Sequence, residues 1–161
     1  MENKFKNLII DVSDYLSDQD VQKIKKAWEF AKLAHTGQKR RSGEAYVNHP
    51  LEIAITLASW RLDATTIVAG LLHDTIEDGG ATREDIVKEF GEDVALLVDG
   101  VTKVSNLRLK DKVSRQQKGV KQELFAENLR KMLLVMAKDV RVVLVKFADR
   151  LHNMETLAAL P

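Results

Sequence analysis

The chain has 161 residues, of which 45% are hydrophobic and 30% charged, so it has the size and composition of one ordinary globular domain, residues 1–161. A net charge of +1 gives no overall attraction to nucleic acid or to a membrane, and any electrostatic steering must be local. Cysteine is absent, which excludes disulfides and thiolate metal sites, and no apolar run reaches membrane-spanning length. We therefore expect a cytoplasmic protein that binds neither nucleic acid nor membrane.

Apolar residues recur at helical spacing along the chain, without β-alternation or an internal repeat, and this predicts an all-α fold. The first helix is expected over residues 5–16. Residues 17–20, Ser-Asp-Gln-Asp, are typical of a capping box before a second helix that ends near Gly37. Residues 38–48 are polar and turn-prone. The next helix is expected to begin at His49-Pro50, because proline fits a first helical turn.

The middle of the chain contains an apolar run, residues 67–72, that is too hydrophobic on all sides to belong to a surface helix. Asp63 is the predicted N-cap of that helix. The run leads directly into residues 73–78, His-Asp-Thr-Ile-Glu-Asp. Residues 82–85 form a second predicted capping box, which opens a short amphipathic helix closed by Gly91.

The second half of the chain is expected to hold three further helical segments. Residues 94–101 mark the first, and helical spacing returns over residues 125–136 and again from Asp139 to Met154. Between them, residues 103–121 carry seven lysines and arginines against one acid, with few apolar anchors. This composition predicts a mobile loop or a loosely held helix.

Charged groups at the mouth of a buried segment need partners or a metal to offset their desolvation. The chain offers two histidines and two aspartates that all border apolar segments: His49, His73, Asp74 and Asp149. This mixed nitrogen and oxygen set suits Mn²⁺ or Fe²⁺ and tolerates Zn²⁺. If the helix that holds His73 continues for one turn, Glu77 and Asp78 lie on the same face, where they could take a proton from a metal-activated water.

Each of these candidates also has a simpler interpretation. A histidine before proline is often a capping residue, and Asp149 could be a solvated residue paired with Lys146 or Arg150. For His152 we prefer a hydrogen-bonded core residue to a metal ligand. The conjunction of four candidates beside apolar segments, with a second acid pair one turn after the first, favours a metal site.

The spaced His, His-Asp and Asp resemble the HD superfamily of metal-dependent phosphohydrolases. The longer strings at residues 40–50, 73–78 and 146–154 resemble the N-terminal hydrolase domain of the RelA/SpoT homologues, which make and degrade (p)ppGpp. Residues 100–103 and 126–132 fit the same pattern, so that the resemblance extends from about residue 25 to the end. It implies an HD-domain helical bundle with a metal site in the core cleft.

The resemblance also implies a reaction, the hydrolytic removal of the 3′-pyrophosphate from ppGpp or pppGpp to give GDP or GTP. The four residues that would hold a single Mn²⁺ are His49, His73, Asp74 and Asp149. The residues that would position and deprotonate the attacking water are Glu77 and Asp78. The residues that would contact the nucleotide are Arg40 against the guanine, Arg41 and Ser42 beside it, Asn153, and Thr156 alongside.

The family pattern continues beyond the point where this sequence stops, at Pro161. We therefore expect either the hydrolase part of a longer enzyme, with a synthetase domain in cis, or a small stand-alone hydrolase. Apolar surface left uncovered would favour a homodimer. Two other functions stay open: a catalytically silent nucleotide-binding module, and an HD phosphohydrolase for another nucleotide. The intact pairs at 73–74 and 77–78 favour an active hydrolase.

Overall fold

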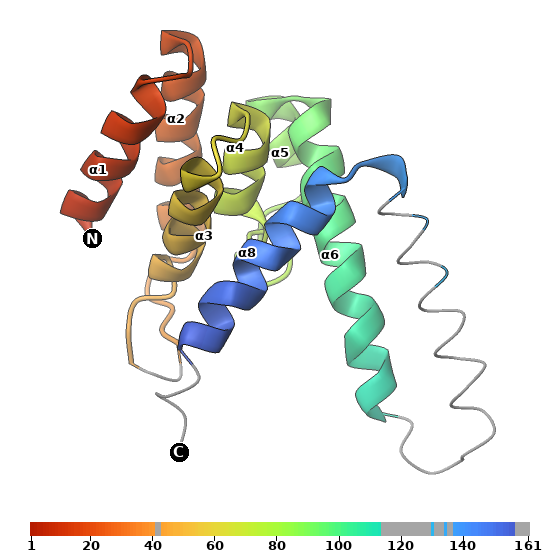
Figure 1. The fold of residues 1–161 in the computed structure, drawn as a ribbon. Coiled ribbons are helices and arrows are strands. Elements are labelled where there is room, and N and C mark those ends of the chain that lie inside the picture. Colours follow the sequence, from red (N-terminus) through yellow and green to blue (C-terminus); the bar gives the residue numbers. More distant parts are fainter. Residues whose placement is uncertain (41–42, 114–129, 131–133, 135–136, 157–161) are drawn as a thin grey trace.

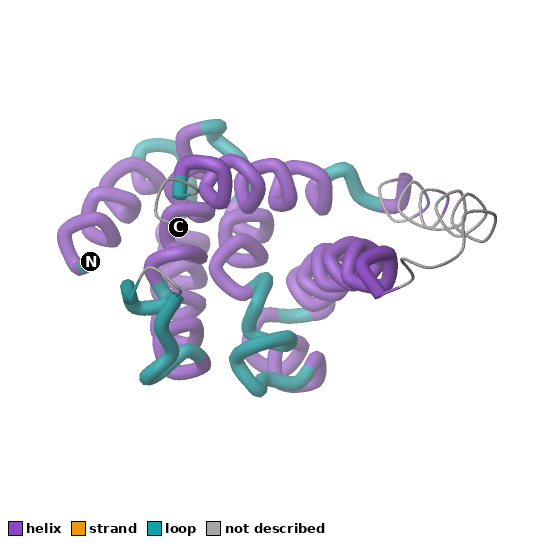
Figure 2. The backbone as a smooth tube through the Cα atoms, turned by 90° about the horizontal axis from the view of Figure 1, so that it is seen from below, coloured by secondary structure: helices purple, strands orange, loops and turns teal. Residues whose placement is uncertain are grey.

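The computed structural model describes residues 1–40, 43–113, 130, 134 and 137–156. Seven helices occupy the described part of the chain, which contains no strand and a single isolated bridge between Lys39 and Ala45 (Figures 1 and 2). The helices are α1 (Glu2–Ser13), α2 (Asp18–Ala34), α3 (Asn48–Ser59), α4 (Ala64–Leu72), α5 (Arg83–Phe90), α6 (Glu92–Val113) and α8 (Arg141–Glu155). The all-α prediction is confirmed. None of the helices within the described ranges is long and apolar enough to cross a membrane.

The predicted helix starts are confirmed by side-chain caps. Ser17 accepts a hydrogen bond from the backbone N–H of Asp20 at the start of α2, and Asp63 accepts one from Thr66 at the start of α4. At the start of α5, Thr82 and Asp85 form a complete reciprocal capping box. These local signals fix where helices begin, and they leave the packing to the apolar faces.

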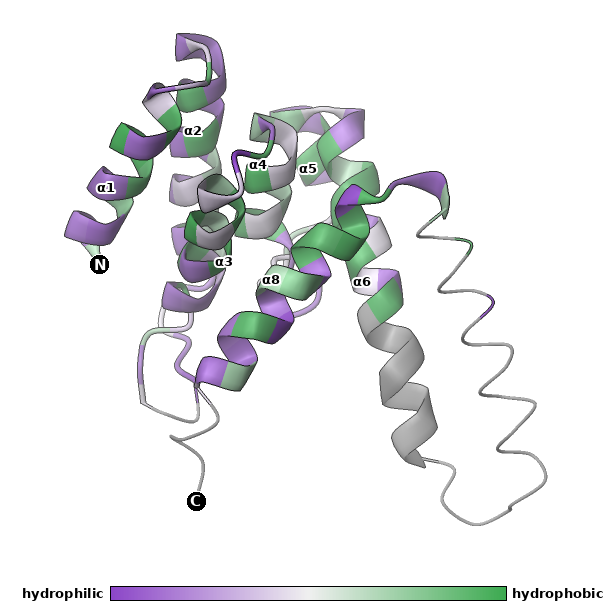
Figure 3. Cartoon of the chain, viewed as in Figure 1, coloured by the Kyte–Doolittle hydropathy of each residue, from purple (hydrophilic) through white to green (hydrophobic). Residues whose placement is uncertain are grey.

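Helix α4 is the centre of the fold. It contacts α2, α3, α6 and α8, and every residue of α4 except Thr65 is buried (Figure 1). A Cβ atom at Gly70 would lie 2.5 Å from Leu57 Cδ1, so glycine allows α3 and α4 to approach closely. Figure 3 shows α4 as largely apolar, whereas α8 has both hydrophilic and hydrophobic residues, as an amphipathic covering helix should.

Helix α4 ends at Leu72, so the helix does not run on through Asp78. Residues 73–78 instead form consecutive turns, in which the N–H of Asp78 donates to Asp74 O at 2.9 Å and that of Gly79 donates to Thr75 O at 3.1 Å. These bonds span four residues, as in a helix. The one-turn offset between the two acid pairs is therefore kept by turns rather than by helix.

The basic segment is partly described. Helix α6 continues to Val113, so of the two predicted alternatives, a mobile loop or a loosely held helix, the structure has a helix over residues 103–113. Residues 114–121 lie outside the described part, as do most of the predicted helical residues 125–136. The helix predicted after Asp139 is confirmed as α8.

Candidate metal centre

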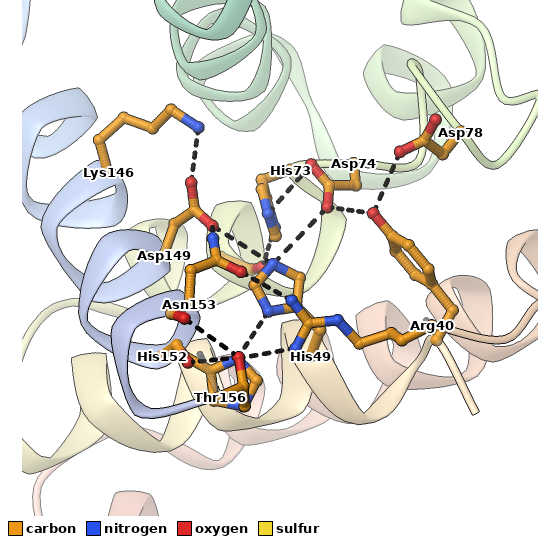
Figure 4. Close-up of polar contacts among 12 residues, drawn as sticks. Arg40, His49, His73, Asp74, Asp78, Lys146, Asp149, His152, Asn153 and Thr156 are labelled. Carbon is orange, nitrogen blue, oxygen red and sulfur yellow. Dashed lines mark hydrogen bonds and ion pairs between the residues drawn. The ribbon is translucent and has the colours of Figure 1, made fainter. Parts of the chain in front are cut away.

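Three segments that are far apart in the sequence bring their polar side chains to one point (Figure 4). His49 lies in the first turn of α3, His73 and Asp74 follow the end of α4, and Asp149 faces inward from α8. His49, His73 and Asp149 are buried, with 4%, 1% and 6% of their surfaces exposed. Burial of so many ionisable groups together requires a compensating interaction.

The predicted ligands converge closely. The ligand atoms of His49, His73 and Asp74 all lie within 4.8 Å of one another, a group that could hold a metal ion. His73 Nε2 lies 3.0 Å from Asp74 Oδ1, and His49 Nε2 lies 3.8 Å from Asp74 Oδ2. Asp149 joins from the other side, with its Oδ1 3.3 Å from His49 Nε2. Its oxygens also accept hydrogen bonds from Lys146 at 2.8 Å and from Asn153 at 2.6 Å.

The hydrogen bonding of His73 tests whether this set fits a cation. His73 Nδ1 donates to Gly70 O at 2.9 Å, because a carbonyl oxygen can only accept. In the neutral ring Nε2 then carries a lone pair, and this buried atom has no hydrogen-bond partner within the described part of the chain. It nevertheless faces Asp74 Oδ1 at 3.0 Å. A lone pair opposite a carboxylate is unfavourable unless a proton or a cation lies between them, so the donor set fits a divalent metal.

The ionisation of these groups suits metal binding. Burial disfavours both carboxylates, but the neighbouring His73 holds the pKa of Asp74 below its usual range. The His49 hydrogen bond and Lys146 do the same for the pKa of Asp149. Burial lowers the pKa of His49, whereas the pKa of His73 is raised because Asp74 outweighs its burial. A metal would replace the proton that Asp74 favours on His73.

The second acid pair borders this centre. Burial and the nearby Asp74 raise the pKa of the Glu77 carboxyl, against the opposing charge of Lys146. A carboxylate with a raised pKa is a stronger base. Asp78 Oδ2 lies 3.0 Å from the Tyr46 hydroxyl, which donates to it.

The residues predicted to contact the nucleotide do not all lie at this centre. Arg40 reaches across to α8, where its Nη2 donates to Asn153 Oδ1 at 2.7 Å. Asn153 in turn donates to Asp149 Oδ1, so Asn153 links Arg40 to Asp149 (Figure 4). The Thr156 hydroxyl instead donates to the carbonyls of His152 and Asn153, at the end of α8. Arg41 and Ser42 lie outside the described residues.

The sequence pattern does not indicate the place of two residues in this site. No motif predicts a role for Tyr46, yet its hydroxyl donates to Asp74 Oδ2 at 2.8 Å, and burial and Asp74 raise its pKa so that it stays protonated. The sequence predicts Lys146 only as the partner of a solvated Asp149, yet its side chain is largely buried against Asp149. It precedes Asp149 by three residues on a helix, a spacing that places both on one face. His152 is hydrogen-bonded as expected, 2.8 Å from His49 Nδ1, but half-buried.

The chain is similar to proteins of a known metal-dependent family. The family model described as HD domain matches residues 27–161, and the chain belongs to that family. Within it, the resemblance to the RelA/SpoT group is confirmed by relatives and by a solved structure. The chain is 51% identical over 146 residues to a "GTP pyrophosphokinase" of Myxococcus xanthus, covering 91% of this chain and 18% of that protein.

Two further matches are informative. The "Bifunctional (p)ppGpp synthase/hydrolase SpoT" of Escherichia coli K12 is 44% identical over 156 residues, which are 97% of this chain and 21% of that protein. A structure described as "A metazoan ortholog of SpoT hydrolyzes ppGpp and plays a role in starvation responses" is 32% identical, with a TM-score of 0.63. The match covers 89% of this chain and 72% of that one. The chain spans about a fifth of the length of the curated relatives.

Proposed function

We propose that residues 1–161 act as a single metal-dependent (p)ppGpp 3′-pyrophosphohydrolase domain. The observation that carries this proposal is the buried convergence of His49, His73, Asp74 and Asp149. A "Guanosine-3′,5′-bis(diphosphate) 3′-pyrophosphohydrolase" of Escherichia coli O157:H7 is 44% identical to the chain, which supports the choice of substrate.

The four converging residues would hold one divalent ion, and we propose Mn²⁺. Two imidazoles and two carboxylates form a mixed nitrogen and oxygen set without sulfur. Such a set suits Mn²⁺ better than it suits a structural Zn²⁺. When bound, such an ion lowers the pKa of a water molecule and polarises a phosphate oxygen.

The acid pair would carry the proton transfer. Glu77 would accept a proton from the attacking water, and Asp78 would orient that water. The water oxygen bonds to the phosphorus next to the ribose, the P–O3′ bond breaks, and pyrophosphate leaves. The 3′ oxygen takes a proton to become a hydroxyl, which gives GDP or GTP. The raised pKa of Glu77 supports this role, because it brings the base closer to working pH.

Positive charge for the substrate would come from the segment after α2. Arg40 would leave Asn153 and pack its planar guanidinium on the guanine, since arginine stacks well on aromatic rings. Asn153 would then be free to contact the nucleotide, with Arg41 and Ser42 near its phosphates and Thr156 alongside.

Two further partners are proposed, a second copy of this chain and a synthetase domain in cis. A homodimer is supported by an apolar groove on the outer face of α8, lined by Trp60, Leu144, Phe147, Arg150, Leu151 and Met154. Phe147 and Met154 are 62% and 67% exposed, which is unusual for such large apolar side chains. Sedimentation over a concentration series would measure this association. A synthetase domain in cis is supported by the greater length of the relatives.

The proposal is tested by incubating the purified chain with ppGpp and Mn²⁺ and separating the products by ion exchange. Recovery of GDP and pyrophosphate in equal amounts, and none after addition of a chelator, is the expected result. Binding of ppGpp without release of pyrophosphate would instead identify a silent binding module. Rapid cleavage of a dNTP or a cyclic nucleotide, with ppGpp left intact, would identify a different substrate.

A further inference from the structure

The Tyr46 hydroxyl joins the metal centre to the acid pair. Its oxygen lies 2.8 Å from Asp74 Oδ2 and 3.0 Å from Asp78 Oδ2. A phenol has one proton to donate, so the two carboxylates share a single donor. Asp74 is a proposed metal ligand and Asp78 a proposed water-orienting residue. The shared hydroxyl of Tyr46 therefore fixes the distance between these two carboxylates.

The contact with Asp74 sets how that carboxylate faces the metal centre. With Oδ2 bound to Tyr46, Oδ1 is directed at His73 Nε2, 3.0 Å away. Without the hydroxyl, the carboxylate would be free to rotate about its last torsion. Groups that hydrogen-bond a ligand in this way orient it and strengthen metal binding.

The contact with Asp78 restrains a residue that is otherwise exposed and lies in a turn. Gln38 holds the backbone of the same residue, because its Nε2 donates to Asp78 O at 2.5 Å. Both the side chain and the main chain of Asp78 are therefore attached to the segment that follows α2.

Tyr46 is itself held in one orientation. Its ring stacks on the buried His35, with centroids 4.7 Å apart and planes 27° from parallel. His35 Nδ1 donates to Gln38 Oε1 at 2.8 Å, and the backbone N–H of Tyr46 donates to Gln38 O at 3.0 Å. His35, Gln38 and Tyr46 together form a unit that we call the tyrosine clamp.

We propose that Tyr46 is a positioning residue for the hydrolysis, and that the tyrosine clamp aligns Asp74 toward the metal and Asp78 toward the attacking water. This inference rests on the proposed function, whose catalytic roles it extends. Tyr46 acts through the two carboxylates and needs no contact with the substrate.

Tyr46→Phe tests the clamp, because phenylalanine keeps the ring on His35 and removes only the hydroxyl. We expect the variant to fold with an unchanged circular dichroism spectrum. Its Mn²⁺ affinity, measured by calorimetric titration, should fall about 10- to 100-fold, the usual effect of losing a partner of a metal ligand. At saturating Mn²⁺, kcat should fall by a similar factor, while KM for ppGpp stays within about threefold.

Tyr15→Phe is the matched control, since Tyr15 is the only other tyrosine in the sequence. Its hydroxyl donates to the carbonyls of Leu62 and Ala58, at the opposite end of α3 from the clamp, so only Tm should change. Mn²⁺ affinity of Tyr46→Phe within twofold of wild type overturns the inference. A raised KM with unchanged kcat also overturns it, by making Tyr46 a substrate-binding residue. If wild type turns over no ppGpp, the proposed function fails, and the Mn²⁺ titration still decides whether the clamp acts on Asp74.

Discussion

Replacing Glu77 with glutamine separates proton transfer from metal binding. Gln keeps the shape of the side chain and cannot accept a proton from water. The pKa of Glu77 is raised above the ordinary value of 4.5, first by burial and then by Asp74, so the fold disfavours its charge. Glu77 is exposed, and a surface substitution of this kind should leave the free energy of unfolding within about 0.5 kcal/mol of wild type.

The catalytic loss should be large. General base catalysis contributes about 10²- to 10⁴-fold to a rate, so kcat of Glu77→Gln should fall by that factor, or about 2.7–5.4 kcal/mol in activation free energy. Since the base must be ionised, wild-type kcat should rise with pH through the raised pKa of Glu77, and the variant should lose this limb of the profile.

The assay combines pyrophosphate release with metal analysis of the same preparations. Glu77→Gln should contain as much metal as wild type. Glu84→Gln is the matched control, because Glu84 is an exposed glutamate in the first turn of α5, away from the metal centre, and its kcat should not change. A metal-free Glu77→Gln protein, or one with kcat within twofold of wild type, would refute the division of roles.

Three other predictions concern this centre and the turn beside it. Asp149→Ala should lose both metal and turnover, as metal analysis and the pyrophosphate assay would show. Its free energy of unfolding, measured by urea titration, should fall by about 3 kcal/mol because Lys146 is left without its buried partner. Mn²⁺ affinity should rise with pH as His73 loses its proton, because the ion and the proton compete for the ring. The pKa of His73 is raised above its ordinary 6.5, so this rise should occur above pH 6.5. Calorimetry that shows no pH dependence of Mn²⁺ affinity would contradict this. Gly79→Ala should cost about 1–3 kcal/mol of stability in a urea titration, because its Cβ would lie 2.8 Å from Thr75 O; an unchanged midpoint would show that the turn can yield.

Much of the fold was predictable because its signals are local. The caps at Ser17, Asp63 and Thr82 depend on residues three positions apart, and the central place of α4 follows from an apolar run with no polar face. The extension of helix through Asp78 was harder to judge. A turn and a helix give the same offset of four residues, and only the backbone hydrogen bonds distinguish them.

Some features of the site could be predicted from the sequence, and others depend on how the helices pack. The sequence alone identified His49, His73, Asp74 and Asp149 as candidate ligands, because few residue types can hold a metal and these border apolar segments. Only the tertiary structure showed that the Tyr46 hydroxyl contacts Asp74. Its donation to Asp74 joins residues 28 positions apart, and no local pattern encodes such a contact. It exists because α3 and α4 pack side by side and bring the segment before α3 against the end of α4.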